Sequence, residues 1–128
     1  MAYIFYNPNP NGMKSNNGDC VIRAIAKALH KSWDDVYWDL CEEGFQMGDW
    51  GNSNAVWDTY LRRNGFKRKV IQNYCPDCYT IRDFCHDNSK GKYILATGSH
   101  VVAVIDGNYY DSWDSGNEIP IFYYERRS

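Results

Sequence analysis

The period at which apolar residues recur changes once along this chain, and that change constrains the fold more than any other feature. Between residues 20 and 64 apolar side chains recur at helical spacing, which is typical of helices that pack through one face. From residue 93 onward they form short β-rich runs separated by turn residues. Helices followed by strands, without βαβ alternation, predict an α+β fold with N-terminal helices packed on a C-terminal antiparallel sheet.

Start and stop signals divide the chain further. Asp19 is expected to be the N-cap of a helix over residues 20–29, whose polar residues Arg23 and Lys27 fall on the side opposite the apolar stripe. Further helices are predicted from Ser32 to the glycine-containing stretch 44–52, over 53–64, and over 80–85. Strands are predicted at 3–6, 67–72, 93–96, 100–105, 108–113 and 119–124.

The strands at 100–105 and 108–113 are predicted to form a β-hairpin, because the Asp-Gly pair between them is a two-residue turn signal. With that turn length, His100 and Asp111 lie on the same face as diagonal neighbours, within reach of a side-chain hydrogen bond. A loop one residue longer would send Asp111 to the opposite face. The hairpin therefore predicts that Asp111 is the carboxylate partner of His100 and that Asp114 points away from His100.

Cys20 opens the first predicted helix, a position that favours the thiolate. The unpaired N–H groups and the dipole at a helix N-terminus lower the pKa of a thiol placed there. Asn16 and Asn17 precede it in a segment that can bend sharply and direct N–H groups toward an oxyanion. Cys20 is thus a candidate nucleophile with Asn16 and Asn17 at the oxyanion hole, and the alternative is a small buried core residue.

Cys20, His100 and Asp111 together make a candidate catalytic triad. The thiolate attacks a carbonyl carbon, the histidine transfers protons, and the carboxylate fixes the imidazole tautomer. We therefore expect a cysteine-dependent hydrolase, a peptidase, isopeptidase or amidase, that acts on a protein or peptide through a thioester and needs no cofactor or metal. Acyl transfer to an amine uses the same chemistry, and a non-catalytic binding scaffold remains an alternative.

The residues around the cysteine resemble the nucleophile loop of ovarian-tumour-type deubiquitinases. Segment 17–24 reads Asn-Gly-Asp-Cys-Val-Ile-Arg-Ala, similar to their Asp-Gly-Asn/Asp-Cys, two apolar residues and Arg-Ala, with Asn17 in place of the first aspartate. His100 and Asp111 on adjacent strands resemble the arrangement in bacteriocin-processing peptidases. The two resemblances imply a papain-like cysteine peptidase fold with Cys20 as nucleophile, His100 as base and Asp111 as the residue that orients it.

The resemblance also has a point of departure. Papain-like enzymes usually carry a glutamine six residues before the nucleophile, and Lys14 stands there. Asn16, Asn17 or the backbone alone would then have to serve the oxyanion. The Gly-Asp-Cys segment is also similar to that of small proteins of bacteria and their phages, which suggests a phage protein acting on a host partner as a further possibility.

Composition excludes other classes of function. The 128 residues fit one domain, and a net charge of -2 without a basic stripe argues against nucleic acid as a partner. No apolar run approaches the roughly 20 residues that span a bilayer, and no charged segment precedes the first apolar residues as in a secretion signal. Five cysteines at irregular spacing argue against a disulfide framework. We therefore expect a soluble cytoplasmic protein without membrane partners, and the resemblance to proteins of bacteria and their phages implies a bacterial or phage-infected cell.

A zinc-stabilised binding module is the principal alternative. Cys75 and Cys78 have the spacing of a zinc knuckle, and Cys85 and His86 offer further ligands. The second pair is not another Cys-x-x-Cys, and adjacent Cys and His rarely both bind one tetrahedral ion. His30, at the end of the first predicted helix, is more simply a cation at a helix C-terminus.

Overall fold

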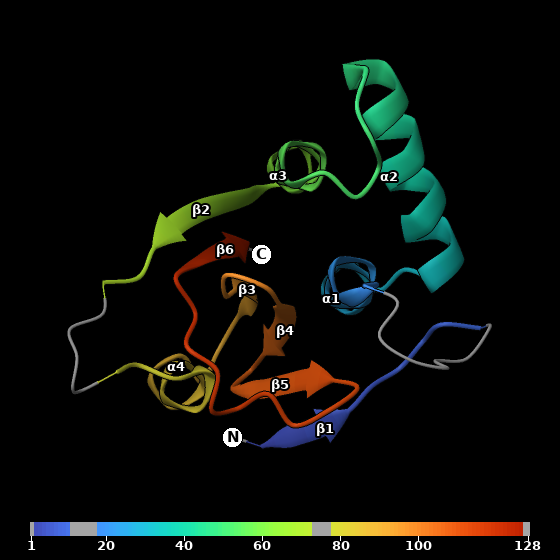
Figure 1. Cartoon of the computed structure of the whole chain (residues 1–128). Coiled ribbons are helices and arrows are strands. Elements are labelled where there is room, and N and C mark those ends of the chain that lie inside the picture. The colour runs from blue at the N-terminus through green and yellow to red at the C-terminus, as the bar shows by residue number, and fades with distance from the viewer. Residues whose placement is uncertain (1, 11–17, 73–77, 127–128) are drawn as a thin grey trace.

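The computed structural model describes residues 2–10, 18–72 and 78–126, and within them the chain forms four helices and six strands (Figure 1). These residues confirm the α+β class. In chain order the elements are β1 (Tyr3–Phe5), α1 (Cys20–Leu29), α2 (Trp33–Met47), α3 (Asn54–Arg63), β2 (Phe66–Val70), α4 (Ile81–Asp87), β3 (Lys92–Ala96), β4 (Val101–Ile105), β5 (Asn108–Asp111) and β6 (Phe122–Arg126).

The sheet is mixed, which corrects the predicted antiparallel sheet. Its strand order is β1-β5-β4-β3-β6-β2, and β1 runs parallel to β5 while every other pair is antiparallel. The N-terminal strand reaches β5 through the pair Tyr3 and Tyr109, whose ring centroids lie 5.6 Å apart. The periodicity of a strand says nothing about its partner, so the sequence pattern could not reveal this long-range pairing.

Helices cover both faces of the sheet. Along β3, Ile94 and Ala96 pack into the core beneath α1 and α3, whereas Tyr93 and Leu95 pack beneath α4. Alternate side chains of a strand point to opposite faces, so the central strands are apolar at nearly every position because both faces are buried. Figure 1 shows α1 and α3 on one side of the strands and α4 on the other, with α2 standing outside α1 and α3.

The predicted hairpin register is confirmed. Ile105 pairs with Asn108, and the pairing continues to Ala103 and Tyr110. The turn residues Asp106 and Gly107 both have positive φ, 50° and 80°, as a two-residue turn that matches the strand twist requires. Strand β5 ends at Asp111, before the predicted limit of residue 113.

Among the other predicted boundaries that differ from the structure by a few residues, two have identifiable local reasons. Helix α2 continues through Gly44 to Met47, so this glycine does not end the helix. Its role is to let the following loop pack closely against the helix, since a Cβ atom at this position would lie 2.7 Å from the carbonyl oxygen of Asp49. Strand β6 begins at Phe122 instead of residue 119, and Pro120, which has no N–H for a ladder, lies between. None of the helices that the structure describes is long and apolar enough to cross a bilayer.

Candidate active site

Cys20 is the first residue of α1 and lies beside Val101, the first residue of the central strand β4. Gly18, two residues earlier, has a φ of 73°, a conformation that glycine adopts without strain and that turns the chain sharply into the helix. Asp19 occupies the N-cap position but makes no side-chain cap hydrogen bond, which corrects the predicted capping role. The dipole of the first turn of α1 therefore acts on Cys20 without a capping carboxylate.

The surroundings of Cys20 favour its thiolate. Its side chain lies close to the imidazole of His100 and to the backbone of Val101, and both stabilise the thiolate. Burial by itself raises the pKa of the Cys20 thiol, but the hydrogen bond and charge of His100, the Val101 backbone and the charge of Arg23 outweigh it and lower the pKa below 9.0. The thiol is half-buried and free of disulfides.

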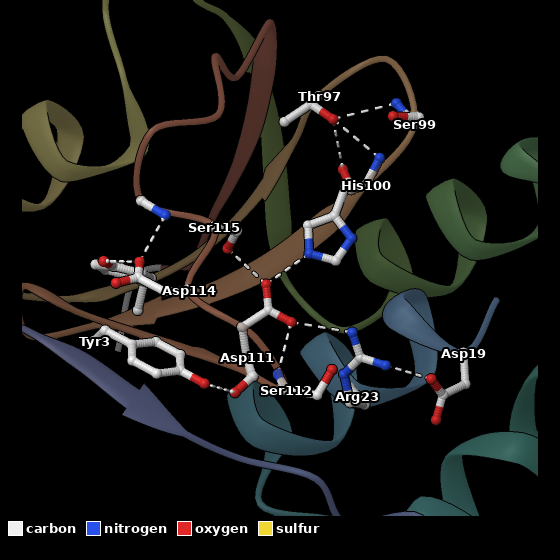
Figure 2. A network of polar contacts seen from close by, with 12 residues as sticks. Tyr3, Asp19, Arg23, Thr97, Ser99, His100, Asp111, Ser112, Asp114 and Ser115 are labelled. Atoms are coloured by element: carbon white, nitrogen blue, oxygen red, sulfur yellow. Dashed lines mark hydrogen bonds and ion pairs between the residues drawn. The ribbon is translucent and has the colours of Figure 1, made fainter. Parts of the chain in front are cut away.

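The turn between β3 and β4 fixes His100. Thr97 Oγ1 accepts hydrogen bonds from the backbone N–H groups of His100 (2.9 Å) and Ser99 (3.2 Å), as Figure 2 shows. The imidazole Nε2 lies 2.6 Å from Asp111 Oδ2, which leaves Nδ1 as the ring nitrogen for Cys20. The indole of Trp113, 45% exposed, covers the imidazole at a centroid distance of 4.9 Å.

The protonated form of His100 is stabilised from two sides. Burial lowers the pKa of the imidazole, but the hydrogen bonds with Asp111 and Cys20 and the charges of both outweigh this and raise the pKa to about 9. The same contacts that raise the pKa of His100 lower the pKa of Cys20. Cys20 and His100 therefore stabilise each other's charged forms, the thiolate and the imidazolium.

Asp111 is 1% exposed and its carboxylate is held by four donors. Oδ2 accepts from His100 and from Ser115 Oγ (2.6 Å), and Oδ1 accepts from the backbone N–H of Ser112 (2.8 Å) and from Arg23 Nη2 (3.0 Å). Burial raises the pKa of Asp111, and the hydrogen bonds from His100, Ser115 and Ser112 lower it to below its ordinary value. The carboxylate is thereby fixed as an anion against His100 (Figure 2).

Arg23 is the residue of this site that the sequence reasoning missed. It was predicted on the outer side of α1, yet it is 5% exposed and forms ion pairs with both Asp111 and Asp19. Asp19 also accepts hydrogen bonds from Trp33 Nε1 (3.0 Å) and Asn9 Nδ2 (3.3 Å). The spacing of Asp19 and Arg23, one helical turn apart, was the available signal for an ion pair.

Strand β1 supports the site from the other side. The carbonyl of Asp111 accepts hydrogen bonds from the backbone N–H of Tyr6 (2.8 Å) and the hydroxyl of Tyr3 (3.2 Å). The backbone of Asp111 is thus held by the N-terminal strand, and its carboxylate by α1 and the hairpin. No local pattern in the sequence indicated this role, because the two segments lie more than 100 residues apart.

The remaining predicted site residues lie elsewhere. Asp114 contacts Tyr109 Oη (2.5 Å) and Arg82 (3.1 Å) instead of His100, in agreement with its predicted direction. Asn16 and Asn17, predicted for the oxyanion hole, lie outside the described residues. The three residues of the predicted triad lie together: His100 is hydrogen-bonded to Asp111, and Cys20 interacts with His100.

The cysteines considered for zinc do not form a metal centre within the described part of the chain. Cys75 lies outside it, and Cys78 is disulfide-bonded, a bond that the argument against a disulfide framework did not anticipate. Cys85 is buried, and burial raises the pKa of its thiol to about 11, which opposes the thiolate that zinc binds. No group of three or more His, Cys, Asp or Glu side chains suited to a metal occurs among the described residues.

The arrangement brings a thiol, an imidazole and a fixed carboxylate together next to a helix N-terminus, and acyl transfer through a thioester uses groups of these kinds. Comparisons with protein-family models, curated proteins and solved structures find no match to this chain. The chemistry of the site must therefore be inferred from its geometry.

Proposed function

We propose that the protein is a papain-like cysteine hydrolase that cleaves an amide or isopeptide bond of a protein or peptide through a thioester on Cys20. The observation that carries the proposal is the continuous chain of contacts from Cys20 through His100 to Asp111. A buried structural cysteine would have a raised pKa, as Cys85 has. The lowered pKa of Cys20, produced by specific contacts with a histidine, supports a nucleophilic role.

Acylation begins with the thiolate–imidazolium pair. The Cys20 sulfur attacks the substrate carbonyl carbon, and the electron pair of the C=O bond moves to the oxygen. As the tetrahedral intermediate collapses, the C–N bond breaks and the His100 imidazolium donates its proton to the leaving amine. The products of this half-reaction are an amine and a thioester on Cys20, with a neutral His100.

Deacylation restores the starting state. Neutral His100 takes a proton from a water molecule, whose oxygen attacks the thioester carbon. Collapse breaks the C–S bond, releases a carboxylic acid and returns the thiolate–imidazolium pair. In both half-reactions the negative oxygen would lie at the N-terminus of α1, where the backbone N–H groups of the first turn, together with Asn16 or Asn17 as predicted, would stabilise it.

Two further residues support the proposal without touching the substrate carbonyl. Asp111 holds the imidazole in one orientation and stabilises its charge, as the third member of a triad does. Trp113 packs against the imidazole ring and would help to shield the contact with Asp111 from water during the reaction.

Turnover of a simple activated ester tests the proposal. With p-nitrophenyl acetate, the wild-type protein should form an acetyl thioester on Cys20, detected by peptide mass spectrometry, and release p-nitrophenol over many cycles. The Cys20→Ala variant should release none beyond background, and His100→Ala should be slowed in both half-reactions. Cys41→Ser is the matched control, because Cys41 is also a free, partly exposed thiol. Turnover that survives in Cys20→Ala, or is lost equally in Cys41→Ser, contradicts the proposal.

A further inference from the structure

A pocket of about 410 Å³ opens between α3 and the strands β6 and β2, on the face of the sheet that α1 also covers. Its floor is aromatic: the rings of Trp57 and Phe122 lie nearly parallel, 13° apart, with centroids separated by 6.4 Å. Its rim is charged and carries two arginines and one aspartate. The lining residues that matter here are Trp57, Asp58, Arg62, Arg68, Phe122 and Tyr124.

The charges on the rim do not cancel. The carboxylate of Asp58 accepts hydrogen bonds from Arg62 Nε (3.0 Å) and from the hydroxyl of Tyr124. Arg68 lies over the ring of Phe122, with its guanidinium carbon 4.2 Å from the centroid, and forms no ion pair with any carboxylate in the described part of the chain. One positive charge is therefore in excess, and it stands beside an aromatic surface.

The strand register relates this pocket to the candidate active site. Val101, which contacts Cys20, pairs with Ala96 of β3, and Ala96 pairs with Phe122 of β6. Adjacent strands lie about 4.8 Å apart, so Phe122 is about 10 Å from Val101 across the end of the sheet. An extended peptide advances about 3.3 Å per residue, and three residues span this distance.

Arg68 differs from the lysines that commonly occur on edge strands. Edge strands often carry lysines that discourage aggregation, and β2 carries Lys67 and Lys69 on the opposite face from Arg68. Lys69 is ion-paired with Glu125 at 2.6 Å. Arg68 instead lies over Phe122 and lines the pocket. Its planar guanidinium is well suited to bind a carboxylate there.

We infer that this pocket is a substrate subsite that binds an acidic residue, with an apolar neighbour, about three residues from the bond that Cys20 attacks. The inference rests on the proposed function because the bound peptide is the substrate. The carboxylate pairs with Arg68, and the apolar neighbour packs on Phe122 and Trp57. The preferred substrates are therefore proteins with an acidic, extended segment near the cleaved bond.

Peptide binding to the Cys20→Ala variant tests the subsite apart from catalysis. The probes are two acetylated, amidated hexapeptides of glycine and alanine that carry a glutamate–leucine pair at the N-terminal or the C-terminal end, and their glutamine–leucine counterparts. In an NMR titration, the indole N–H signal of Trp57 should shift with one glutamate peptide. That peptide should bind about fivefold more tightly than its glutamine counterpart, as expected of a partly exposed ion pair.

A charge reversal separates the subsite from a general effect of net charge. Arg68→Glu should abolish the preference for glutamate, whereas Lys67→Glu, the same change on the opposite face of the same strand, should leave it intact. Equal binding of glutamate and glutamine peptides, or equal loss in both variants, overturns the subsite. Failure of the proposed function would appear separately, as absent turnover of p-nitrophenyl acetate, whose small acyl group does not reach the pocket.

Discussion

His100 Nε2 lies 2.6 Å from Asp111 Oδ2, and the contact is fixed by a two-residue turn in the β-hairpin that joins β4 to β5. The turn places both residues on one face, and the contact stabilises the imidazolium that in turn lowers the pKa of Cys20. The pKa of the Cys20 thiol thus depends on the length of a turn.

Replacing Asp111 by asparagine should slow the alkylation of Cys20 by iodoacetamide at about pH 6 at least about tenfold, because losing the carboxylate lowers the pKa of His100 and weakens the ion pair. Quantitative mass spectrometry of the labelled cysteine gives the rate constant. Asp114→Asn is the control, since Asp114 contacts Tyr109 and Arg82 and should leave the rate unchanged. If Asp114→Asn slows the alkylation of Cys20 and Asp111→Asn does not, the triad is misassigned.

Arg23→Met should lower the free energy of unfolding at pH 7 by about 3 kcal/mol, because it leaves the buried carboxylates of Asp19 and Asp111 without their shared cation. Urea unfolding measures the loss. Lys27→Met, one turn further along α1, is the control: its ammonium lies over the ring of Tyr110 and should contribute less than about 1 kcal/mol.

The destabilisation caused by Arg23→Met should change with pH in a definite direction. The pKa of Asp111 is lowered in the folded protein, so its stabilising contribution is present above the ordinary value of 3.8 and is lost as the pH falls through the lowered pKa. Removal of the Arg23 cation, which pairs with Asp111, should raise the pKa of the Asp111 carboxylate relative to the wild-type protein. The difference in unfolding free energy between Arg23→Met and wild type should therefore narrow from pH 7 to about pH 4, and a constant difference would argue against an ionic role.

Gly44→Ala should destabilise the protein even though alanine is the better helix former by about 1 kcal/mol. The added Cβ would lie 2.7 Å from the carbonyl oxygen of Asp49, and such overpacking costs about 1–3 kcal/mol. Thermal or urea unfolding measures the net change. Gly98→Ala is the control, because nothing lies within 4 Å of the corresponding Cβ. A more stable Gly44→Ala protein would mean that the loop does not pack against α2 as described.

The accuracy of the sequence-based predictions followed the range of the interactions involved. The bounds of α1 and the register that brings His100 to Asp111 depend on helical period and turn length, which are local, and both were predicted correctly. The parallel pairing of β1 with β5 depends on residues more than 100 positions apart, and no pattern revealed it.

Arg23 was assigned to the wrong side of α1 for a related reason. Its charge suggested solvent, and the carboxylate that stabilises it there, Asp111, lies 88 residues away. Burial of a charge is decided by its partners, which periodicity does not show. Asp19 was likewise read as a helix cap, although its carboxylate is engaged by Arg23 and Trp33.

The pH dependence of Cys20 alkylation, compared between wild type and His100→Ala, tests the central claim most directly. In the wild-type protein the rate constant should reach half its maximum below pH 9.0, and a second inflection should appear near pH 9 as His100 loses its proton. In His100→Ala the first midpoint should move upward by at least about one unit, because burial continues to raise the pKa of the thiol while its main opposing contact is gone. The same midpoint in both proteins would contradict a thiolate–imidazolium pair at this site.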